Sequence, residues 1–319
     1  MHLIINPTDI YYLTGVRSHD PGEILIIYDE NNQSTILCDL RTSALFGREN
    51  YQICDQRSEW GDIFARYAIL DTDPDFLTQT LRKKIEAYGV RLSSVKSPIT
   101  RKRVIKTQTE IELLQTSQKL NKNVYERILP FLIPGVTENE IARKIQILQL
   151  ELGASGSSFP PIVAFGENSA VPHHSPTERK LRPEDIILLD MGLVYQGYCS
   201  DMTRMVYQEN IPDEARKIGE LVTWVTDEII TWAKPGMKAA ELDRKARELL
   251  GEYEKYFTHS LGHGVGLDIH EAPHVSSKSD EILEPGMIIT IEPGIYIAGE
   301  YGARYEEMCL VSKEGMSLF

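Results

Sequence analysis

Apolar residues in the first hundred positions recur in short runs that turn-forming residues separate. Residues 2–6 form one apolar run, which ends at the turn-like sequence Asn-Pro-Thr-Asp. Residues 22–29 and 35–39 form two more runs on either side of a polar tetrapeptide, a pattern that predicts a β-hairpin. Apolar residues over 76–88 follow helical spacing instead. Strands and helices that alternate in this way predict a small α/β domain over residues 1–100.

The segment over residues 97–106 resembles a linker, and helical spacing of the apolar residues resumes after it. The spacing predicts one helix over residues 109–129 and a second from Thr137 to Gly153. Each begins with a threonine that is followed three residues later by a glutamate. This is the capping-box pattern, in which each side chain bonds the backbone N–H of the other residue. We therefore expect a second domain over residues 107–319.

An internal repeat organises this second domain. Residues 134–144 resemble residues 235–245, and residues 181–192 resemble residues 283–294. Solenoid units are only about 20 to 50 residues long, so a spacing of roughly one hundred predicts a duplicated half-domain. Each half would hold a helix, a loop and a strand. Two matched blocks at nearly the same spacing are hard to attribute to chance.

Composition narrows the kinds of partner. The chain has 319 residues, of which 42% are hydrophobic, and a net charge of −13. Such an acidic chain is a poor binder of nucleic acids or anionic membranes, so we expect neither as a partner. No apolar run reaches transmembrane length, and no charged leader precedes the first apolar run. The four widely separated cysteines, with no CxxC pair, predict free thiols in a cytoplasmic protein: Cys38, Cys54, Cys199 and Cys309.

Two aspartates of the first half are expected side by side. Asp190 ends the apolar run over 186–189, which predicts a buried strand. An isolated buried carboxylate is very costly, so Asp190 must be paired or bound to metal. Asp201 follows after a hairpin-like segment that would return the chain to Asp190. Two adjacent carboxylates repel unless they share a proton or a cation. A salt bridge with Arg204 is an equally open explanation of these charges.

The second half repeats this layout. Glu292 ends the matching apolar strand, and Glu306 follows across a glycine-containing turn. With Asp190, Asp201 and His263, these residues make a set of four carboxylates and one imidazole. An oxygen-rich set of this kind suits two divalent ions of the manganese, cobalt, iron or zinc type. A structural zinc site would need thiolates, and the cysteines are not placed to supply them.

Histidines gather in two segments of the second domain. The run over 258–273 holds three of the eight histidines among glycines that let the backbone approach a bound group closely: His259, His263 and His270. The polar, proline-punctuated segment 168–176 should be a loop. It carries His173 and His174, which either face the metal site or lie exposed in solvent. The glycines around His263 lack the GxGxxG spacing and the preceding strand of a dinucleotide site.

Taken together, the motifs NSAVPH, LLDMG, YCSDMTR, HSLGHGVGLDIHEAP, TIEPGIY and ARYEE resemble those of the pita-bread metallopeptidases. The resemblance is to the proline-directed branch, which holds aminopeptidase P (Xaa-Pro aminopeptidase) and prolidase (Xaa-Pro dipeptidase). It is strong over residues 107–319 and looser before them, through NPTDIYYLTG. It implies an α+β protein whose C-terminal pita-bread domain has two halves related by a pseudo-twofold axis. The N-terminal α/β domain would be of the creatinase/prolidase type, in a shortened form.

The resemblance also implies roles for the acidic set. Asp190 would hold one metal ion, and Asp201 would bridge both ions. His263 and Glu292 would hold the second ion. Glu306 would bridge both ions and act as the general base. The implied cofactor is a pair of divalent ions, with manganese ahead of cobalt, iron and zinc.

Four further residues match family positions near the substrate. His173 would lie near the scissile bond, and His270 would contact the substrate carbonyl and the tetrahedral intermediate. His259 would line the proline side of the pocket. Arg304 would contribute to substrate binding and would orient the metal ligands. The resemblance also implies a homodimer in which the N-terminal domain of one subunit helps to wall the other subunit's site.

The implied reaction is hydrolysis of the bond between an N-terminal residue and proline, by a hydroxide that bridges two metal ions. Many prolidases carry an arginine after HExP, suited to a dipeptide's carboxylate, and this chain has His274 there. That difference weakens a strict dipeptidase assignment without excluding it. Three competing functions are a methionine aminopeptidase, a creatinase-like enzyme for a non-peptide C–N bond, and a non-catalytic binding module. The complete ligand set argues against the last two.

Overall fold

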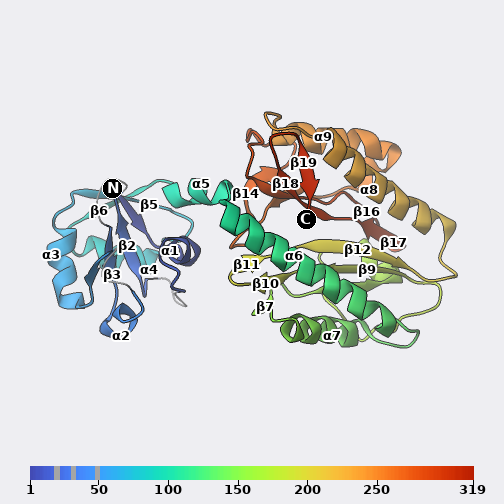
Figure 1. The fold of residues 1–319 in the computed structure, drawn as a ribbon, viewed down its shortest axis with the longest axis horizontal. Coiled ribbons are helices and arrows are strands. Elements are labelled where there is room, and N and C mark those ends of the chain that lie inside the picture. Colours follow the sequence, from blue (N-terminus) through green and yellow to red (C-terminus); the bar gives the residue numbers. More distant parts are fainter. Residues whose placement is uncertain (18–21, 30–33, 47–50) are drawn as a thin grey trace. The chain divides into compact units, whose positions relative to one another are not determined.

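The computed structural model describes four stretches of the chain: residues 1–17, 22–29, 34–46 and 51–319. The chain forms two compact units, Met1–Arg103 and Val104–Phe319 (Figure 1). Each unit has its own buried apolar core. In the described stretches, no helix is long and apolar enough to cross a membrane.

The first unit is built on a six-stranded mixed sheet in the order β4-β3-β2-β1-β5-β6. The strands are β1 (His2–Ile4), β2 (Leu25–Tyr28), β3 (Thr35–Leu37), β4 (Gln52–Cys54), β5 (Ile69–Thr72) and β6 (Arg91–Ser94). The helices are α1 (Pro7–Thr14), α2 (Leu40–Ser43), η1 (Arg57–Glu59), α3 (Trp60–Phe64), α4 (Gln79–Glu86) and α5 (Pro98–Val104), the last of which ends in the second unit. Strands β2 and β3 pair antiparallel, which confirms the predicted hairpin. The tetrapeptide between them lies outside the described residues.

One local prediction for this unit was wrong. The sequence after β1 is a helix start and not a turn, because the Asn6 side chain accepts the Thr8 N–H and Pro7 occupies the first helical turn. The segment expected to be a linker contains the helix α5, which the sequence analysis did not predict. Its Arg103 forms a buried ion pair with Asp9 at 2.9 Å. This pairing to α1 stabilises structure that the local sequence does not indicate.

The first half of the second unit packs two helices on two small antiparallel sheets. Its helices are α6 (Gln108–Ile128), η2 (Leu129–Phe131), α7 (Glu138–Glu151) and η3 (Gly166–Ala170). Its strands are β7 (Gly156–Ser157), β8 (Ile162–Phe165), β9 (Ile186–Met191), β10 (Leu193–Tyr195), β11 (Tyr198–Cys199) and β12 (Met202–Tyr207). The sheets have the orders β12-β9-β8 and β11-β10-β7. Strand β9 is buried along its whole length, as the apolar run predicts.

The second half repeats this plan. Its helices are α8 (Asp213–Trp232), α9 (Ala239–Leu250) and η4 (Gly251–Tyr256). Its strands are β13 (Gly262–Gly264), β14 (Glu271–Val275), β15 (Ile288–Ile291), β16 (Gly294–Ile297), β17 (Tyr301–Arg304), β18 (Glu307–Val311) and β19 (Met316–Leu318). The sheets have the orders β14-β13-β15-β18-β19 and β16-β17. Within this unit, α7 and α9 lie at opposite edges, with strands of both halves between them (Figure 1).

Equivalent backbone contacts in the two halves confirm the duplication. The residue before α7 forms a bridge with Lys180, and the residue before α9 forms one with Ile282. The N–H of Gly135 donates to the Leu181 carbonyl at 2.9 Å, and Gly236 donates to Leu283 at 2.8 Å. Both glycines have a positive φ, of 96° and 91°. The same type of turn therefore precedes α7 and α9 and bonds each to the segment before its half's central strand.

The two first-half helices test the capping-box predictions. Helix α7 begins with the predicted box, in which Thr137 and Glu140 bond each other's backbone N–H. Helix α6 also begins with a capping box, but the box is formed by Thr107 and Glu110, two residues before the predicted start at residue 109. The chain offers two overlapping Thr-x-x-Glu patterns here. The backbone of Lys106 bonds the Gly286 carbonyl at 2.9 Å, which fixes the chain just before Thr107 and selects the first pattern.

The cysteines agree with the sequence analysis. All four are buried, and none of them forms a disulfide. Burial raises the pKa of the Cys309 thiol strongly, so this thiol is a packing group and not a nucleophile. Cys309 and Cys199 pack in apolar clusters of the second unit.

Gly192 connects β9, which carries Asp190, to β10, and we predict that Gly192→Ala destabilises the second unit. An added Cβ would lie 2.0 Å from the Ser200 carbonyl oxygen and 2.1 Å from Ser158 Oγ, so the backbone must shift. Overpacking of this kind costs about 1–3 kcal/mol of unfolding free energy. Urea unfolding, followed by the fluorescence of Trp224 and Trp232 on α8, measures the loss.

Gly61→Ala is the control for this prediction. Gly61 lies in α3 of the first unit, and an added Cβ would meet Tyr88 at an ordinary 3.5 Å. Alanine is also the better helix former. We expect no loss of stability in this variant. An unchanged urea midpoint for Gly192→Ala would contradict the close packing at the β9–β10 connection.

Candidate active site

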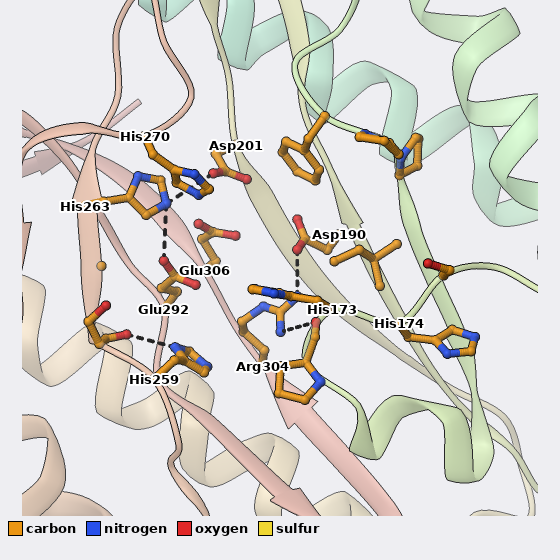
Figure 2. Close-up of a pocket in the computed structure, with 18 of the residues that line it drawn as sticks. His173, His174, Asp190, Asp201, His259, His263, His270, Glu292, Arg304 and Glu306 are labelled. Carbon is orange, nitrogen blue, oxygen red and sulfur yellow. Dashed lines mark hydrogen bonds and ion pairs between the residues drawn. The ribbon is translucent and has the colours of Figure 1, made fainter. Parts of the chain in front are cut away.

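The predicted acidic ligands and all five predicted histidines line one cavity of about 560 Å³ in the second unit (Figure 2). Strands of both halves contribute to its floor. Apolar residues form part of its wall: Phe159, Pro160, Pro161, Ile162, Pro172 and Pro176. The duplicated halves therefore meet at a single polar centre with an apolar side.

The first half supplies its two aspartates as the sequence predicts. Strands β9 and β12 pair antiparallel, with Asp190 opposite Thr203. Asp201 lies just before β12, so the hairpin brings it next to Asp190 in the cavity. Arg204 does not form the alternative salt bridge, because it pairs with Glu307 and donates to the Glu306 carbonyl.

The second half presents two glutamates in the corresponding places. Glu292 follows β15 directly, and Glu306 precedes β18. Strands β15 and β18 pair antiparallel, as β9 and β12 do. The N–H of Glu306 donates to the Thr203 carbonyl at 3.3 Å, which joins the two halves beside the site. The carboxylates of both halves consequently face each other across the cavity (Figure 2).

His263, on β13, points its imidazole into this acidic group (Figure 2). Its Nε2 lies 3.4 Å from Glu292 Oε1 and 3.6 Å from Asp201 Oδ2. Its Nδ1 lies 3.0 Å from the Gly264 carbonyl, which can only accept, so Nδ1 carries the proton. Burial lowers the pKa of His263 to about 4. The imidazole is therefore neutral and directs the Nε2 lone pair at the carboxylates, as metal ligation requires.

Burial raises the pKa of every carboxyl group in the cluster, and repulsion by neighbouring carboxylates adds to the increase at three of them. Burial is the larger cause at Asp201 and Glu306, and each also repels neighbouring carboxylates. Burial raises the pKa of Asp190 despite the nearby Arg304. Burial likewise raises the pKa of Glu292 to about 8. The cluster is thus a strained set of acids that protons or cations would relieve.

The donor set fits divalent cations. Ligand atoms of Asp201, His263 and Glu306 lie within 4.8 Å of one another. Asp190 Oδ1 is buried, and no group in the described part of the chain hydrogen-bonds to it. A buried carboxylate oxygen without a partner is costly unless a cation binds it. Oxygen donors with one imidazole suit manganese and related ions.

Arg304 lies beneath the cluster and holds it in place. Its Nη2 donates to Asp190 Oδ2 at 2.6 Å, and its Nε donates to Thr203 Oγ1 at 3.0 Å. The Thr203 hydroxyl donates in turn to Glu306 Oε2 at 2.8 Å. Arg304 is 3% exposed, so its guanidinium orients ligands rather than reaching into the open cavity.

Tyr296 extends this network to His259. Arg304 Nη1 donates to the Tyr296 hydroxyl at 2.6 Å, and that hydroxyl lies 2.9 Å from His259 Nε2. His259 Nδ1 lies 2.8 Å from the Ser260 carbonyl, so Nδ1 must donate and Nε2 must accept from Tyr296. Burial lowers the pKa of His259 to about 4, consistent with a neutral ring. Both ring nitrogens are bonded within the protein, which leaves the carbon edge and the ring faces for a ligand.

The remaining histidines divide into two groups. His173 and His270 line the cavity and are exposed in it, and the His270 ring packs edge-on to His263 at 4.3 Å. His274 is exposed beside them. His174 turns away from the cluster, and its Nε2 bonds Glu138 at 2.9 Å (Figure 2). Of the two loop histidines, only His173 faces the acidic cluster.

Sequence reasoning missed two residues of this site. Thr203 lies two residues after Asp201 on a strand, and the two-residue period of a strand would have placed both on one face. Tyr296 belongs to the quoted motif TIEPGIY, but nothing in its local sequence shows that its hydroxyl meets an arginine. A buried tyrosine usually bonds its hydroxyl to a partner, which was the only general signal.

Comparisons with known proteins agree with this geometry. Residues 112–313 match the model of metallopeptidase family M24. The chain is 34% identical, over 98% of its own length and 92% of the relative's, to an uncharacterized peptidase of Staphylococcus saprophyticus. It is 33% identical, over 98% of its length and 92% of the relative's, to an uncharacterized peptidase of Staphylococcus aureus.

Solved structures with the same fold include proline-directed enzymes. An Xaa-Pro dipeptidase from Bacillus anthracis superposes with a TM-score of 0.93 at 30% identity, over 99% of this chain and 91% of that one. A prolidase from Pyrococcus furiosus gives 0.90 at 30% identity, over 99% and 94%. An X-Pro aminopeptidase from Thermotoga maritima gives 0.88 at 25% identity, over 100% and 95%. The family match and these likenesses together show that the chain belongs to metallopeptidase family M24, with the pita-bread fold of its proline-directed members.

Proposed function

We propose that this protein removes an N-terminal residue that precedes proline, and that the buried carboxylate cluster around His263 carries the reaction. Five residues would hold two divalent ions, with manganese as the first candidate: Asp190, Asp201, His263, Glu292 and Glu306. Bound ions would lower the pKa of a water molecule and polarise the scissile carbonyl. The orphaned Asp190 oxygen and the neutral His263 are the observations that support this assignment most directly.

The chain's own groups would then perform four tasks. Glu306, between the two halves, would accept the proton of the attacking water. His270 is open to the cavity on one side, and partial burial of its ring lowers its pKa, so its neutral imidazole would donate an N–H to the developing oxyanion. His173 would bind the substrate near the scissile bond from the opposite side of the cavity. Arg304 would hold the Asp190 carboxylate in place directly, and it would hold Glu306 in place through the Thr203 hydroxyl.

Proline specificity is supported by the shape of the wall. Phe159, Pro160 and Pro161 line the apolar side of the cavity, which suits a pyrrolidine ring. His259 lines the same cavity and would present its carbon edge to the substrate's proline, because both its nitrogens are bonded within the protein. The proteins named as Xaa-Pro dipeptidase and X-Pro aminopeptidase among the similar structures support the same substrate class.

The length of the substrate separates two candidate functions. A dipeptide's carboxylate needs a cation, and Arg304 is the only arginine or lysine among the described residues that line the cavity. Its guanidinium is bonded to Asp190, Thr203 and Tyr296. This favours longer Xaa-Pro peptides, with strict dipeptidase activity as the second candidate. We also infer a homodimer from the resemblance to the family, and a cytoplasmic location from the four cysteines, which form no disulfide.

Cleavage of paired substrates tests this function. We expect protein stripped with a chelator to be inactive toward Xaa-Pro-Xaa and to recover activity when manganese is added. Cleavage of Xaa-Pro should be weaker. The carboxylate of a dipeptide needs a cation, and the arginine that lines the cavity already bonds Asp190, Thr203 and Tyr296. Chromatographic detection of the released amino acid measures both reactions. Preferred cleavage of dipeptides would identify a prolidase, and no cleavage of either substrate by metal-loaded protein would refute the proline-directed assignment.

Glu306→Gln tests the proposed base. The amide keeps the size of the side chain but cannot accept the proton of the attacking water, so kcat should fall by about 10²–10⁴-fold. The matched control is Glu300→Gln. This substitution removes the same charge, but at an exposed residue six positions earlier in the chain. We expect the control to retain wild-type rates. If Glu306→Gln retained kcat at full metal occupancy, another group would have to be the base.

Metal binding should release protons near neutral pH. Glu292 has a pKa of about 8, and the pKa values of Asp201 and Glu306 are raised as well, so the metal-free cluster holds protons at pH 7. A cation displaces these protons, and its apparent affinity should therefore increase with pH. Calorimetric titration with manganese in buffers of different ionisation enthalpy measures the number released. A heat that does not depend on the buffer would contradict the shifted pKa values.

A further inference from the structure

A buried glutamate outside the metal cluster anchors the loop that carries His173. Glu138 is the first residue of α7 and is fully buried. Its Oε1 accepts the backbone N–H of Phe165 at 2.9 Å and the Asn168 side-chain amide at 2.8 Å. Its Oε2 bonds His174 Nε2 at 2.9 Å and both the N–H and the hydroxyl of Thr177, at 2.9 and 2.6 Å. One carboxylate thus joins the last residue of β8 to Asn168, His174 and Thr177 in the segment that follows it.

These contacts satisfy the buried charge completely. An isolated carboxylate would be strongly disfavoured in this position, whereas hydrogen bonds to an ionised acceptor are among the strongest in proteins. The surrounding donors lower the pKa of Glu138 although burial, the largest single influence, opposes them. Glu138 is therefore a fixed anion around which the loop is organised.

The duplicated half shows that the fold does not require this carboxylate. The position equivalent to Glu138 is Ala239, the first residue of α9. The backbone bonds at the two positions match, since Glu138 N–H donates to the Arg179 carbonyl and Ala239 N–H donates to the Glu281 carbonyl. The same helix–sheet turn therefore forms with an alanine. The glutamate is present only in the half whose loop carries His173.

The loop is held from the other side by the active-site network. Arg304 Nη1, which bonds Tyr296, also lies 3.3 Å from the Pro172 carbonyl. Ser169 Oγ accepts the N–H of Gly302 at 2.9 Å. His173 stands between Pro172, which Arg304 anchors, and His174, which Glu138 anchors. Both of its chain neighbours are fixed, so the backbone of His173 is held beside the cavity into which its imidazole projects (Figure 2).

We propose that Glu138 is a positioning residue for His173, an inference that rests on the proposed function of His173 at the scissile bond. Glu138 contacts neither the acidic cluster nor the cavity in these bonds. Its effect on the reaction would pass through His174 and the loop backbone. Displacing a positioned group by about 1 Å can cost about 100-fold in rate even when the substitution lies away from the reacting atoms.

Glu138→Gln is the most direct test. Each carboxylate oxygen faces a backbone N–H, so the new amide nitrogen must oppose the N–H of either Phe165 or Thr177. Side chains in the loop can reorient, but these backbone donors cannot become acceptors. We expect kcat/KM for an Xaa-Pro-Xaa peptide to fall by about tenfold to 100-fold, mainly through kcat, at unchanged metal content.

Combination with His173→Ala separates positioning from a general loss of structure. If Glu138 acts through His173, adding Glu138→Gln to His173→Ala should change kcat/KM further by no more than about twofold, the limit of ordinary additivity. If Glu138 only stabilises the unit, its tenfold or larger effect will persist in that background and overturn the proposal. His174→Ala, which leaves the carboxylate intact and removes one contact, supplies a milder variant should Glu138→Gln fold poorly. Its loss should show the same dependence on His173.

The control is Glu140→Gln on the same helix. Glu140 is exposed, bonds only at the cap of α7 in the contacts described, and can be replaced there by glutamine. We expect its kcat/KM to stay within about twofold of wild type. A loss equal to that of Glu138→Gln would assign the effect to the helix start and overturn the proposal.

A readout without substrate keeps this test independent of the proposed reaction. Acylation of individual histidines by diethyl pyrocarbonate, followed by mass spectrometry, should accelerate at His174 in Glu138→Gln. Acylation of the exposed His274 should not change. Suppose that the wild-type protein cleaves no Xaa-Pro peptide, but that acylation of His174 accelerates in Glu138→Gln. The proposed function then fails, and the anchoring of His174 by Glu138 stands. Equal acylation of His174 in both proteins would overturn the anchoring itself.

Discussion

The second unit depends on keeping four carboxyl groups and a neutral imidazole together in one buried place. Burial and mutual repulsion raise the pKa values of these acids, so the cluster opposes its own formation. Arg304 offsets part of this cost at Asp190, and Thr203 offsets part of it at Glu306. The rest of this electrostatic cost would be relieved by a bound cation, so the cluster should bind cations strongly. Function and stability in this region are therefore linked, because the state that relieves the repulsion is the metal-bound state in which we propose the reaction to occur.

Duplication explains how a chain builds such a cluster. Two copies of one helix–turn–sheet unit each present a carboxyl group at the end of a central strand, and the pairing of the halves brings Asp190 and Glu292 to a common cavity. The departures from symmetry have separate roles. His263 supplies nitrogen from the second half only, whereas Glu138, where the other copy has Ala239, organises a loop in the first half only. The matched carboxylates at the strand ends form the acidic cluster, and the unmatched side chains add the nitrogen ligand and the organised loop.

The sequence predicted features whose causes are local or periodic. Strand β9 and the carboxylates at strand ends follow from apolar runs that end in an acid, and the duplicated turns follow from matched sequence blocks. Features set by distant contacts were missed. The start of α6 depended on Lys106 meeting the Gly286 carbonyl, and α5 is paired to α1 through Arg103. Thr203 lay within reach of strand periodicity, but Tyr296 and Glu138 derive their roles from partners far along the chain, which no local pattern specifies.

The bonding of His259 separates the catalytic step from substrate selection. Its Nδ1 donates to a carbonyl and its Nε2 accepts from Tyr296, which is itself held by Arg304. A histidine bonded in this way can neither transfer a proton nor ligate a metal without breaking the network. It can still present a rigid apolar edge, and the guanidinium that fixes this edge also fixes Asp190. One arginine thereby holds both Tyr296, which bonds the group that would select proline, and Asp190, which would bind a metal ion. We conclude that substitutions at Arg304 should disturb selectivity and rate together, whereas substitutions at Tyr296 should act chiefly on the recognition of proline.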